Sequence, residues 1–267
     1  MEEEKSYGVV DLSNRWYDKY VESLPSLDDR VAIITGANSG MGFWAANAMA
    51  YKGCCVVLAC RSLQKANAAK KEILRRFPDA HLDVMELDNM DFGSVRGFAQ
   101  RFQRKYQRLD YLVNNAGIMT RPYTLSKNGF DCQFQTNHLA HFLLTKLLWN
   151  TMLQTPGQSR VVMHSSAFHF IGLVRFDRNQ PEFPPYGWGI LGLNLLMVCV
   201  VFPLCGMRNL DQWFRYFVTK LANLLFMREL AAKIEEKGLQ DKLRIWTLMI
   251  FLFCVDKLPS KNNYAGS

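Results

Sequence analysis

Residues 31–42 read VAIITGANSGMG, a short apolar run that leads into a glycine-rich turn. Glycine permits a tight turn, lets the backbone approach a phosphate and allows close packing at the start of a helix. The Ala-rich segment that follows, 42–52, has the composition of a helix. Because free N–H groups at a helix N-terminus favour negative charge, this strand, turn and helix predict a site for a dinucleotide pyrophosphate.

The same alternation of strand and helix continues along the chain. Apolar runs that predict strands lie at 31–36, 54–60, 81–88, 109–117, 160–166 and 243–250. Segments that predict helices lie between them, at 42–52, 62–76, 91–106, 130–154 and 209–237. This order favours βαβ crossovers, so we predict an α/β fold: a Rossmann-like, doubly wound parallel sheet of about six strands.

The chain of 267 residues is long enough for one well-buried α/β domain. We place that domain at 30–250. A polar arm, 1–29, precedes it and has some helical amphipathicity between Trp16 and Leu24. A long apolar insert, 171–208, interrupts the domain, and a short polar tail, 251–267, follows it.

Composition excludes some classes of function. The net charge of +8 suits an anionic cofactor or an anionic membrane surface, or a diffusely solvated surface, since Lys and Arg are scattered. No basic stripe with interleaved aromatic residues appears, so nucleic acid is not an expected partner. Nothing in the sequence predicts a particular oligomeric state.

The seven cysteines include no CxxC pair and no metal-ligand spacing, so we expect no metal. Cys54, Cys55 and Cys60 lie in or beside an apolar run, where thiols act as small hydrophobic groups, which favours a reducing, cytosol-facing compartment. The first residues, MEEEKSYGVV, have no apolar core, so we expect no cleavable signal peptide.

The end of the second strand indicates which nicotinamide cofactor is preferred. An NAD site usually carries an acid there for the ribose 2′-hydroxyl. This chain has Cys60 and then Arg61, whose guanidinium can pair with a 2′-phosphate. We therefore predict NADP(H); the alternative is a surface arginine at a strand end.

Taken together, these motifs resemble the short-chain dehydrogenase/reductases, and specifically their retinol-dehydrogenase-like branch. The resemblance extends over roughly residues 28–250. The matching stretches, in family order, are TGANSGMG (35–42), ACRS (59–62), Leu87-Asp88, NNAG (114–117), TNHLAHFLLT (136–145), HSS (164–166) and YFVTKLANLLFMREL (216–230).

The resemblance implies an NADP(H)-dependent oxidoreductase that interconverts a carbonyl and an alcohol on a lipophilic substrate such as a retinoid, steroid or aldehyde. It implies that Asp88 contacts the adenine and that Asn114 stabilises the central strand. The implied catalytic residues are Asn137, Ser166, Tyr216 and Lys220. The implied cofactor-binding residues are Gly36, Asn38, Ser39, Gly40, Met41, Gly42, Arg61, Asp88, Asn115, Ala116, Gly117, Tyr216 and Lys220.

The chemistry of the implied catalytic residues is also reasonable on its own terms. Tyr216 and Lys220 are four positions apart and share one face of a helix. A nearby ammonium favours phenolate, so we expect Lys220 to lower the phenol pKa of Tyr216 into a range useful for acid–base work. Ser166 would hydrogen-bond the substrate oxygen. By resemblance, Asn137 would anchor a water that links Lys220 to a proton relay.

Other readings of these residues are weaker. Tyr186 is nearer to Ser166 in sequence, but position 190 is isoleucine, so no cation follows at the right spacing. His164 or His169 beside Ser166 could suggest a hydrolase, yet no G-x-S-x-G elbow is present. We read both as packing or surface residues. We read His138 and His141 as polar helix positions rather than metal ligands, for want of a suitably spaced third ligand.

The insert departs from the family pattern. It separates Ser166 from Tyr216 by 50 positions, roughly twice what the resemblance leads us to expect, and 186–207 carries no formal charge. A stretch of about 20 apolar residues can span a bilayer, but one crossing would place Ser166 and Tyr216 on opposite sides. We therefore expect a re-entrant or interfacial segment on the cytoplasmic face of a membrane such as the endoplasmic reticulum. The alternative is a lid over the substrate.

The last apolar run is a second departure. The family continues with a Pro-Gly turn, a substrate helix and a final strand, none of which we find in LRIWTLMIFLFCVDKLPSKNNYAGS. We therefore expect the C-terminal elements of the family to be missing. This leaves a second possibility: a truncated, catalytically inactive NADP-binding or membrane-associated interaction protein.

Overall fold

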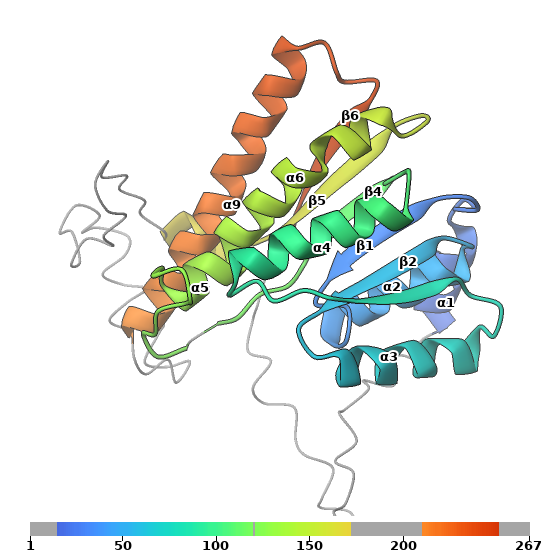
Figure 1. Cartoon of the computed structure of the whole chain (residues 1–267), viewed down its shortest axis with the longest axis horizontal. Coiled ribbons are helices and arrows are strands. Elements are labelled where there is room, and N and C mark those ends of the chain that lie inside the picture. Colours follow the sequence, from blue (N-terminus) through green and yellow to red (C-terminus); the bar gives the residue numbers. More distant parts are fainter. Residues whose placement is uncertain (1–14, 120, 172–209, 251–267) are drawn as a thin grey trace, which may run out of the picture.

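A central parallel sheet lies between two groups of helices in the computed structural model, which describes residues 15–119, 121–171 and 210–250 (Figure 1). The sheet has six strands in the order β3-β2-β1-β4-β5-β6, and every neighbouring pair is parallel. The strands are β1 (Val31–Thr35), β2 (Cys55–Cys60), β3 (Leu82–Glu86), β4 (Tyr111–Asn114), β5 (Ser159–Ser166) and β6 (Leu243–Ile250). The predicted Rossmann-like sheet is thus confirmed.

Helices cover both faces of the sheet (Figure 1). One apolar core joins α4, α6 and α9 to one face, and a second joins α2 and α3 to the other. The helical elements are α1 (Arg15–Ser23), α2 (Gly40–Tyr51), α3 (Leu63–Arg76), α4 (Phe92–Lys105), α5 (Cys132–Phe134), the π-helical turn η1 (Gln135–Leu139), α6 (Ala140–Gln154), the 3₁₀ turn η2 (Ala167–Ile171) and α9 (Leu210–Glu236).

The order of the strands determines where a ligand can bind. All five residues of β1 are buried, as expected for a central parallel strand with both faces covered. From β1 the chain first builds outward to β2 and β3 and then returns to the other side of β1 with β4. In doubly wound sheets, ligands bind at such a reversal, outside the carboxyl ends of the strands.

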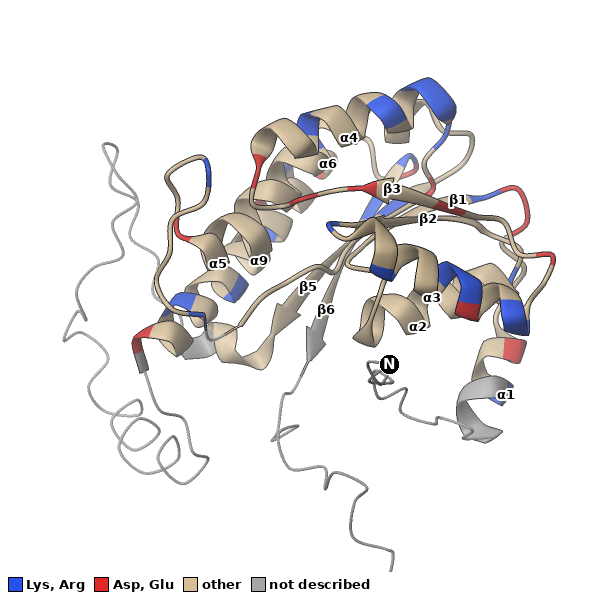
Figure 2. Ribbon diagram, turned by 60° about the horizontal axis from the view of Figure 1, so that its bottom comes forward, with Lys and Arg blue, Asp and Glu red and all other residues tan. Residues whose placement is uncertain are grey.

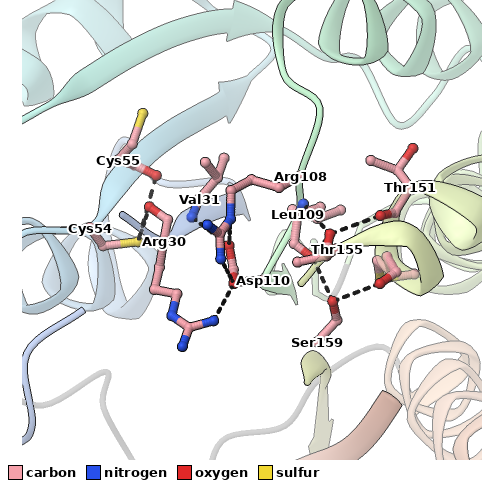
Figure 3. A network of polar contacts seen from close by, with 11 residues as sticks. Arg30, Val31, Cys54, Cys55, Arg108, Leu109, Asp110, Thr151, Thr155 and Ser159 are labelled. Carbon is pink, nitrogen blue, oxygen red and sulfur yellow. Dashed lines mark hydrogen bonds and ion pairs between the residues drawn. The ribbon is translucent and has the colours of Figure 1, made fainter. Parts of the chain in front are cut away.

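The opposite, amino-terminal edge of the sheet is held by a buried carboxylate (Figure 3). Asp110 is fully buried and accepts hydrogen bonds from Arg30 Nη1 (2.9 Å), Arg108 Nε (2.8 Å) and the backbone N–H of Val31 (2.9 Å). Burial alone would raise the pKa of Asp110, but these bonds outweigh it and hold the pKa below its ordinary value. The network joins the starts of β1 and β4.

Most predicted elements differ from the observed ones by one or two residues at an end, and two differ more. The strand predicted at 109–117 ends at Asn114, because the N–H of Asn115 turns to Thr35 Oγ1 (2.9 Å) and leaves the ladder. The helix predicted at 130–154 is divided into α5, η1 and α6. Asp131 begins it, accepting the N–H of Phe134 at 2.9 Å in a side-chain cap.

Charge and thiols are distributed much as the sequence suggests. Figure 2 shows Lys and Arg on α3 and α4, with acidic residues in nearby loops. Cys54 and Cys60 are buried free thiols.

Some predictions fall outside the described residues. They concern the insert 171–208 beyond its first residue, its charge-free part 186–207, and the tail 251–267. Among the helices in the described ranges, none is long and apolar enough to cross a membrane.

Candidate active site

The glycine-rich turn lies where β1 ends and α2 begins, and its glycines are needed for different reasons. Gly36 and Gly40 have φ values of +66° and +54°, which side-chain-bearing residues rarely adopt. A Cβ at Gly42 would lie 2.6 Å from the carbonyl oxygen of Gly36 and 2.5 Å from Asn115 Nδ2, too close for either atom. Ser39 makes no side-chain cap, which leaves the first N–H groups of α2 available to an anion.

A cavity of about 740 Å³ extends from this turn along the carboxyl edge of the sheet, a volume typical of ligand and cofactor sites. Most of the residues predicted to bind the cofactor line it: Gly36, Asn38, Ser39, Met41, Arg61, Asp88, Asn115, Ala116, Gly117, Tyr216 and Lys220. Gly40 and Gly42 do not line the cavity; they belong to the glycine-rich turn at its start.

The far end of the cavity contains Tyr216 and Lys220, one turn apart on α9 and both buried. Lys220 Nζ lies 5.3 Å from the centre of the Tyr216 ring and donates a hydrogen bond to the carbonyl oxygen of His164 at 3.2 Å. The phenol of Tyr216 is hydrogen-bonded to the side chain of Ser166 at the end of β5. Three of the four predicted catalytic residues therefore meet at one place.

Asn137, the fourth, lies in η1 directly behind them and is itself buried. Its Nδ2 donates to Thr219 Oγ1 at 3.1 Å and to the carbonyl oxygen of Ile118 at 2.9 Å. Its Oδ1 accepts the N–H of Ile118 at 2.8 Å. Asn137 thus fixes the loop after β4 against α9 and does not itself line the cavity.

The protonation of the site differs from the prediction. Burial raises the pKa of Tyr216 to about 12, and the hydrogen bond with Ser166 offsets this only in part. Burial also lowers the pKa of Lys220 to about 8. The expectation of a lowered phenol pKa is therefore wrong for this structure, because burial disfavours the charged phenolate.

The opposite end of the cavity carries the residues predicted to select the nucleotide. Arg61 is exposed there, and its Nη1 lies 3.9 Å from the sulfur of Met90. Asp88 Oδ1 accepts the N–H of Met90 at 3.0 Å, which fixes the carboxylate at the cavity wall. A guanidinium and a carboxylate therefore stand close to the place where an adenosine would lie.

An aromatic cluster lies beside Tyr216. Phe217 is fully buried and stacks on Phe168 with ring centres 4.9 Å apart. Trp213, Phe214 and Met119 pack against the same pair of residues, Tyr216 and Phe217. The Tyr216 side chain is therefore packed against apolar residues, while its hydroxyl is hydrogen-bonded to Ser166.

Sequence reasoning missed several residues of the site. His164, read as packing or surface, lines the cavity beside Lys220, and Asn89 and Thr136 line it too. His141, read as a polar helix position, is almost completely buried and lies 2.9 Å from Thr35 Oγ1. Asn89 could have been suspected, since it directly follows Asp88; the histidines carry no such signal. Within the described ranges, no group of three His, Cys, Asp or Glu residues could hold a metal ion.

The family model described as short chain dehydrogenase matches residues 30–177. Retinol dehydrogenase 12 of Mus musculus is 37% identical over 209 residues, which cover 78% of this chain and 58% of the relative. Retinol dehydrogenase 13 of Homo sapiens is 32% identical over 216 residues, covering 81% and 58%. The match thus spans less than two thirds of these relatives.

Solved structures show the same architecture. An uncharacterized protein from Mycobacterium paratuberculosis is 34% identical, with a TM-score of 0.64 over 86% of this chain and 70% of that one. A short chain dehydrogenase from Escherichia coli CFT073, solved in complex with NADPH, has a TM-score of 0.59 at 22% identity and covers 84% and 78%. At that identity, the second likeness concerns the fold alone.

Proposed function

This chain belongs to the short chain dehydrogenase family, and on that premise we propose that it is an NADP(H)-dependent oxidoreductase that interconverts a carbonyl and an alcohol on a small lipophilic molecule. One observation carries the proposal. The phenol of Tyr216 is hydrogen-bonded to Ser166 and lies beside the buried ammonium of Lys220, at the end of a cavity that starts at the glycine turn.

The residues of the cavity fit a nicotinamide dinucleotide. The turn has no room for a Cβ at Gly42, and the uncapped N–H groups of α2 suit a pyrophosphate. Asp88 and the backbone of Asn115–Gly117 would hold the adenosine side, and Tyr216 and Lys220 the nicotinamide side. Once bound, such a cofactor supplies or accepts the hydride.

The side chains of the site transfer the proton. In carbonyl reduction, Tyr216 donates its phenolic proton to the substrate oxygen as the carbon gains hydride, and Ser166 holds that oxygen by a hydrogen bond. Lys220 stabilises the resulting phenolate and assists its reprotonation. In alcohol oxidation the same steps run in reverse, and Tyr216 receives the proton. Asn137 acts from behind, keeping α9 and the loop after β4 in place.

The preference for NADP(H) rests on Arg61. Its guanidinium lines the adenosine end of the cavity, where it can pair with a 2′-phosphate. Asp88, the acid nearby, already accepts the N–H of Met90. A positive charge at the position where NAD-dependent proteins usually carry an acid favours the phosphorylated cofactor.

The lipophilic substrate class rests on two points. The aromatic cluster packs beside Tyr216, and the apolar side chains of Ile118, Met119 and Pro122 line the cavity. The relatives named above are retinol dehydrogenases, so their printed names imply a greasy alcohol or aldehyde. We propose the same class here without choosing among retinoid, steroid and aldehyde.

The experiment is a turnover assay with the purified full chain and NADPH on retinal, a steroid ketone and an aliphatic aldehyde. Tyr216→Phe removes one oxygen atom and should lower turnover by about 10²- to 10⁴-fold. NADPH binding, followed by quenching of tryptophan fluorescence, should be retained. Tyr51→Phe, an exposed tyrosine on α2, is the matched control and should change neither value.

Three other outcomes would count against the proposal. Undiminished turnover of Tyr216→Phe would remove Tyr216 from its role. NADPH binding without turnover of any substrate would favour the alternative of an inactive NADP-binding protein. Equal or tighter binding of NADH would contradict the assigned cofactor.

We also propose that the charge-free stretch 186–207 holds the enzyme on the cytoplasmic face of a membrane such as the endoplasmic reticulum. The net charge of +8 would assist contact with anionic lipid. Flotation with vesicles of phosphatidylcholine and phosphatidylserine tests this. Leu195→Arg should reduce the bound fraction while NADPH binding persists; an unchanged bound fraction would contradict it.

A further inference from the structure

His141, at the start of α6, joins the two halves of the site. The side chain is almost completely buried, and each ring nitrogen has a polar neighbour. Nε2 lies 2.9 Å from Thr35 Oγ1 and 3.1 Å from Asn89 Nδ2. Nδ1 lies 3.2 Å from the backbone carbonyl oxygen of Asn137.

These partners fix the tautomer. The amide nitrogen of Asn89 can only donate, so Nε2 of His141 must accept. A neutral imidazole has one N–H, which is therefore on Nδ1 and points to an oxygen that can only accept.

The surroundings keep this ring neutral. Burial lowers the pKa of His141 to about 3, and the charge of Lys220 and the nearby His138 and His164 act in the same direction. The ring is consequently neutral at neutral pH and keeps one orientation of hydrogen bonds there.

The Nε2 side leads to the cofactor turn. Thr35 Oγ1 accepts the N–H groups of Asn115 and Ala116, both at 2.9 Å. Its own proton is within reach of Nε2 of His141 at 2.9 Å, which is closer than its other acceptor, the Val113 carbonyl oxygen at 3.4 Å. Asn115 Nδ2 in turn donates to the carbonyl oxygen of Thr35 at 2.9 Å and packs against Gly42. This side therefore ties the end of β1 to the end of β4, where the cavity begins.

The Nδ1 side leads to the catalytic end. The Asn137 carbonyl oxygen that receives the proton of Nδ1 also accepts Asn223 Nδ2 at 3.1 Å. That same amide reaches the carbonyl oxygen of His164 at 3.1 Å, and this oxygen accepts Lys220 Nζ at 3.2 Å. A continuous set of hydrogen bonds thus connects His141 to the Lys220 ammonium.

We propose that His141 is a positioning residue. Through Nε2 it holds the glycine turn in place, and through Nδ1 it holds Asn137 and, through the hydrogen bonds that follow, Lys220. Cofactor affinity and turnover would then depend on separate atoms of one ring. The turnover half rests on the proposed function; the affinity half does not.

Two substitutions separate the atoms. In His141→Asn, the amide nitrogen takes the place of Nδ1 and the Nε2 partners are lost. In His141→Gln, the amide oxygen takes the place of Nε2 and the bond to the Asn137 carbonyl is lost. We expect His141→Asn to raise the Kd for NADPH by about 3- to 30-fold with kcat within about twofold of wild type. We expect His141→Gln to lower kcat by about 3- to 30-fold and shift its pH profile, with the Kd nearly unchanged.

The control is Leu148→Ala, a fully buried apolar position farther along α6. It should lose stability and leave both the Kd and the pH profile unchanged. If neither His141 variant folds, Thr35→Val replaces them: it should raise the Kd as His141→Asn does, and Thr35→Ser should restore it.

The proposal is overturned if the Asn and Gln variants change Kd and kcat in the same proportion, or if Thr35→Val leaves the Kd unchanged. A failure of the proposed function gives a different result. Wild type would then lack turnover, while the Kd of His141→Asn for NADPH would still exceed the nearly equal values of His141→Gln and wild type.

Discussion

The ammonium nitrogen of Lys220 lies 5.3 Å from the centre of the Tyr216 ring, and the two side chains are only 3% and 6% exposed. Burial moves their pKa values apart, to about 8 for Lys220 and about 12 for Tyr216. At neutral pH the phenol carries its proton and the amine is charged. Tyr216 is therefore in the protonation state that can donate a proton, as carbonyl reduction requires.

Lys220→Met should raise the free energy of unfolding at pH 7 by about 1–3 kcal/mol, because it removes a buried charge. The folded-state pKa of about 8 is below the ordinary value of 10.5, so the cost of burying the charge is complete below pH 8. Above pH 8 the folded state loses its proton first, and the cost disappears toward pH 10.5. Urea unfolding at pH 7 and at pH 10 should show the gain at the lower pH only.

The same Lys220→Met variant should lose turnover, so stability and activity move in opposite directions. Lys146→Met, an exposed lysine on α6, serves as the control and should change neither. Lower stability of Lys220→Met at pH 7 would mean that the ammonium is better solvated than its burial implies.

Arg61→Ser should weaken NADPH binding by about 10- to 100-fold and leave NADH binding unchanged, because only the 2′-phosphate loses a charge-assisted partner. Titration of tryptophan fluorescence with each cofactor gives both values. Arg75→Ser, at the far end of α3 and 75% exposed, is the matched loss of one positive charge. Equal losses of NADPH affinity in the two arginine variants would mean that the effect comes from net charge and not from a contact with the 2′-phosphate.

Gly42→Ala should weaken NADPH binding by more than about tenfold and cost about 1–3 kcal/mol of stability, since the new methyl group overlaps the turn. The displaced atoms would be the carbonyl oxygen of Gly36 and Nδ2 of Asn115, both at the cofactor turn. Gly129→Ala is the control: its φ is +80°, but nothing lies within 4 Å of the added Cβ. It should lose stability through backbone strain and keep its affinity for NADPH.

Asp110→Asn should lower the free energy of unfolding at pH 7 by about 1–3 kcal/mol, because two arginines lose their anionic partner. Arg30 is 40% exposed and Arg108 27%, so water compensates part of the loss. The pKa of Asp110 is depressed, so its contribution is present above the unfolded-state pKa and is lost as pH falls below that range. Denaturant unfolding at pH 7 and pH 3.5 should show a smaller difference at the lower pH, with NADPH binding at pH 7 unaffected.

The parallel sheet could be predicted from the sequence because each strand is an apolar run and each crossover contains a periodic helix. The ends of the elements could not. The strand that stops at Asn114 does so because Thr35, 80 positions earlier than Asn115, captures the next N–H. Such a contact depends on the neighbouring strand and leaves no local signal.

The candidate site could likewise be predicted from the sequence only in part. The four-residue spacing of Tyr216 and Lys220 and the glycine turn are local features, and the structure brings them to one cavity as expected. The direction of the phenol pKa shift was predicted wrongly, because the burial of Tyr216 depends on how α9 packs in the fold. His141 was missed for a similar reason: its partners lie on β1, on the loop after β3 and in η1.

The π-helical turn at Gln135–Leu139 holds Asn137 in the segment just before α6. A π turn is an α turn that contains one surplus residue, and each residue in a helix rotates the next by about 100°. Removing His138 or Leu139, which lie between Asn137 and α6, would therefore rotate Asn137 and α5 about the helix axis relative to α6. The orientation of this asparagine thus depends on a one-residue insertion, and a deletion there would be as damaging as replacing the asparagine.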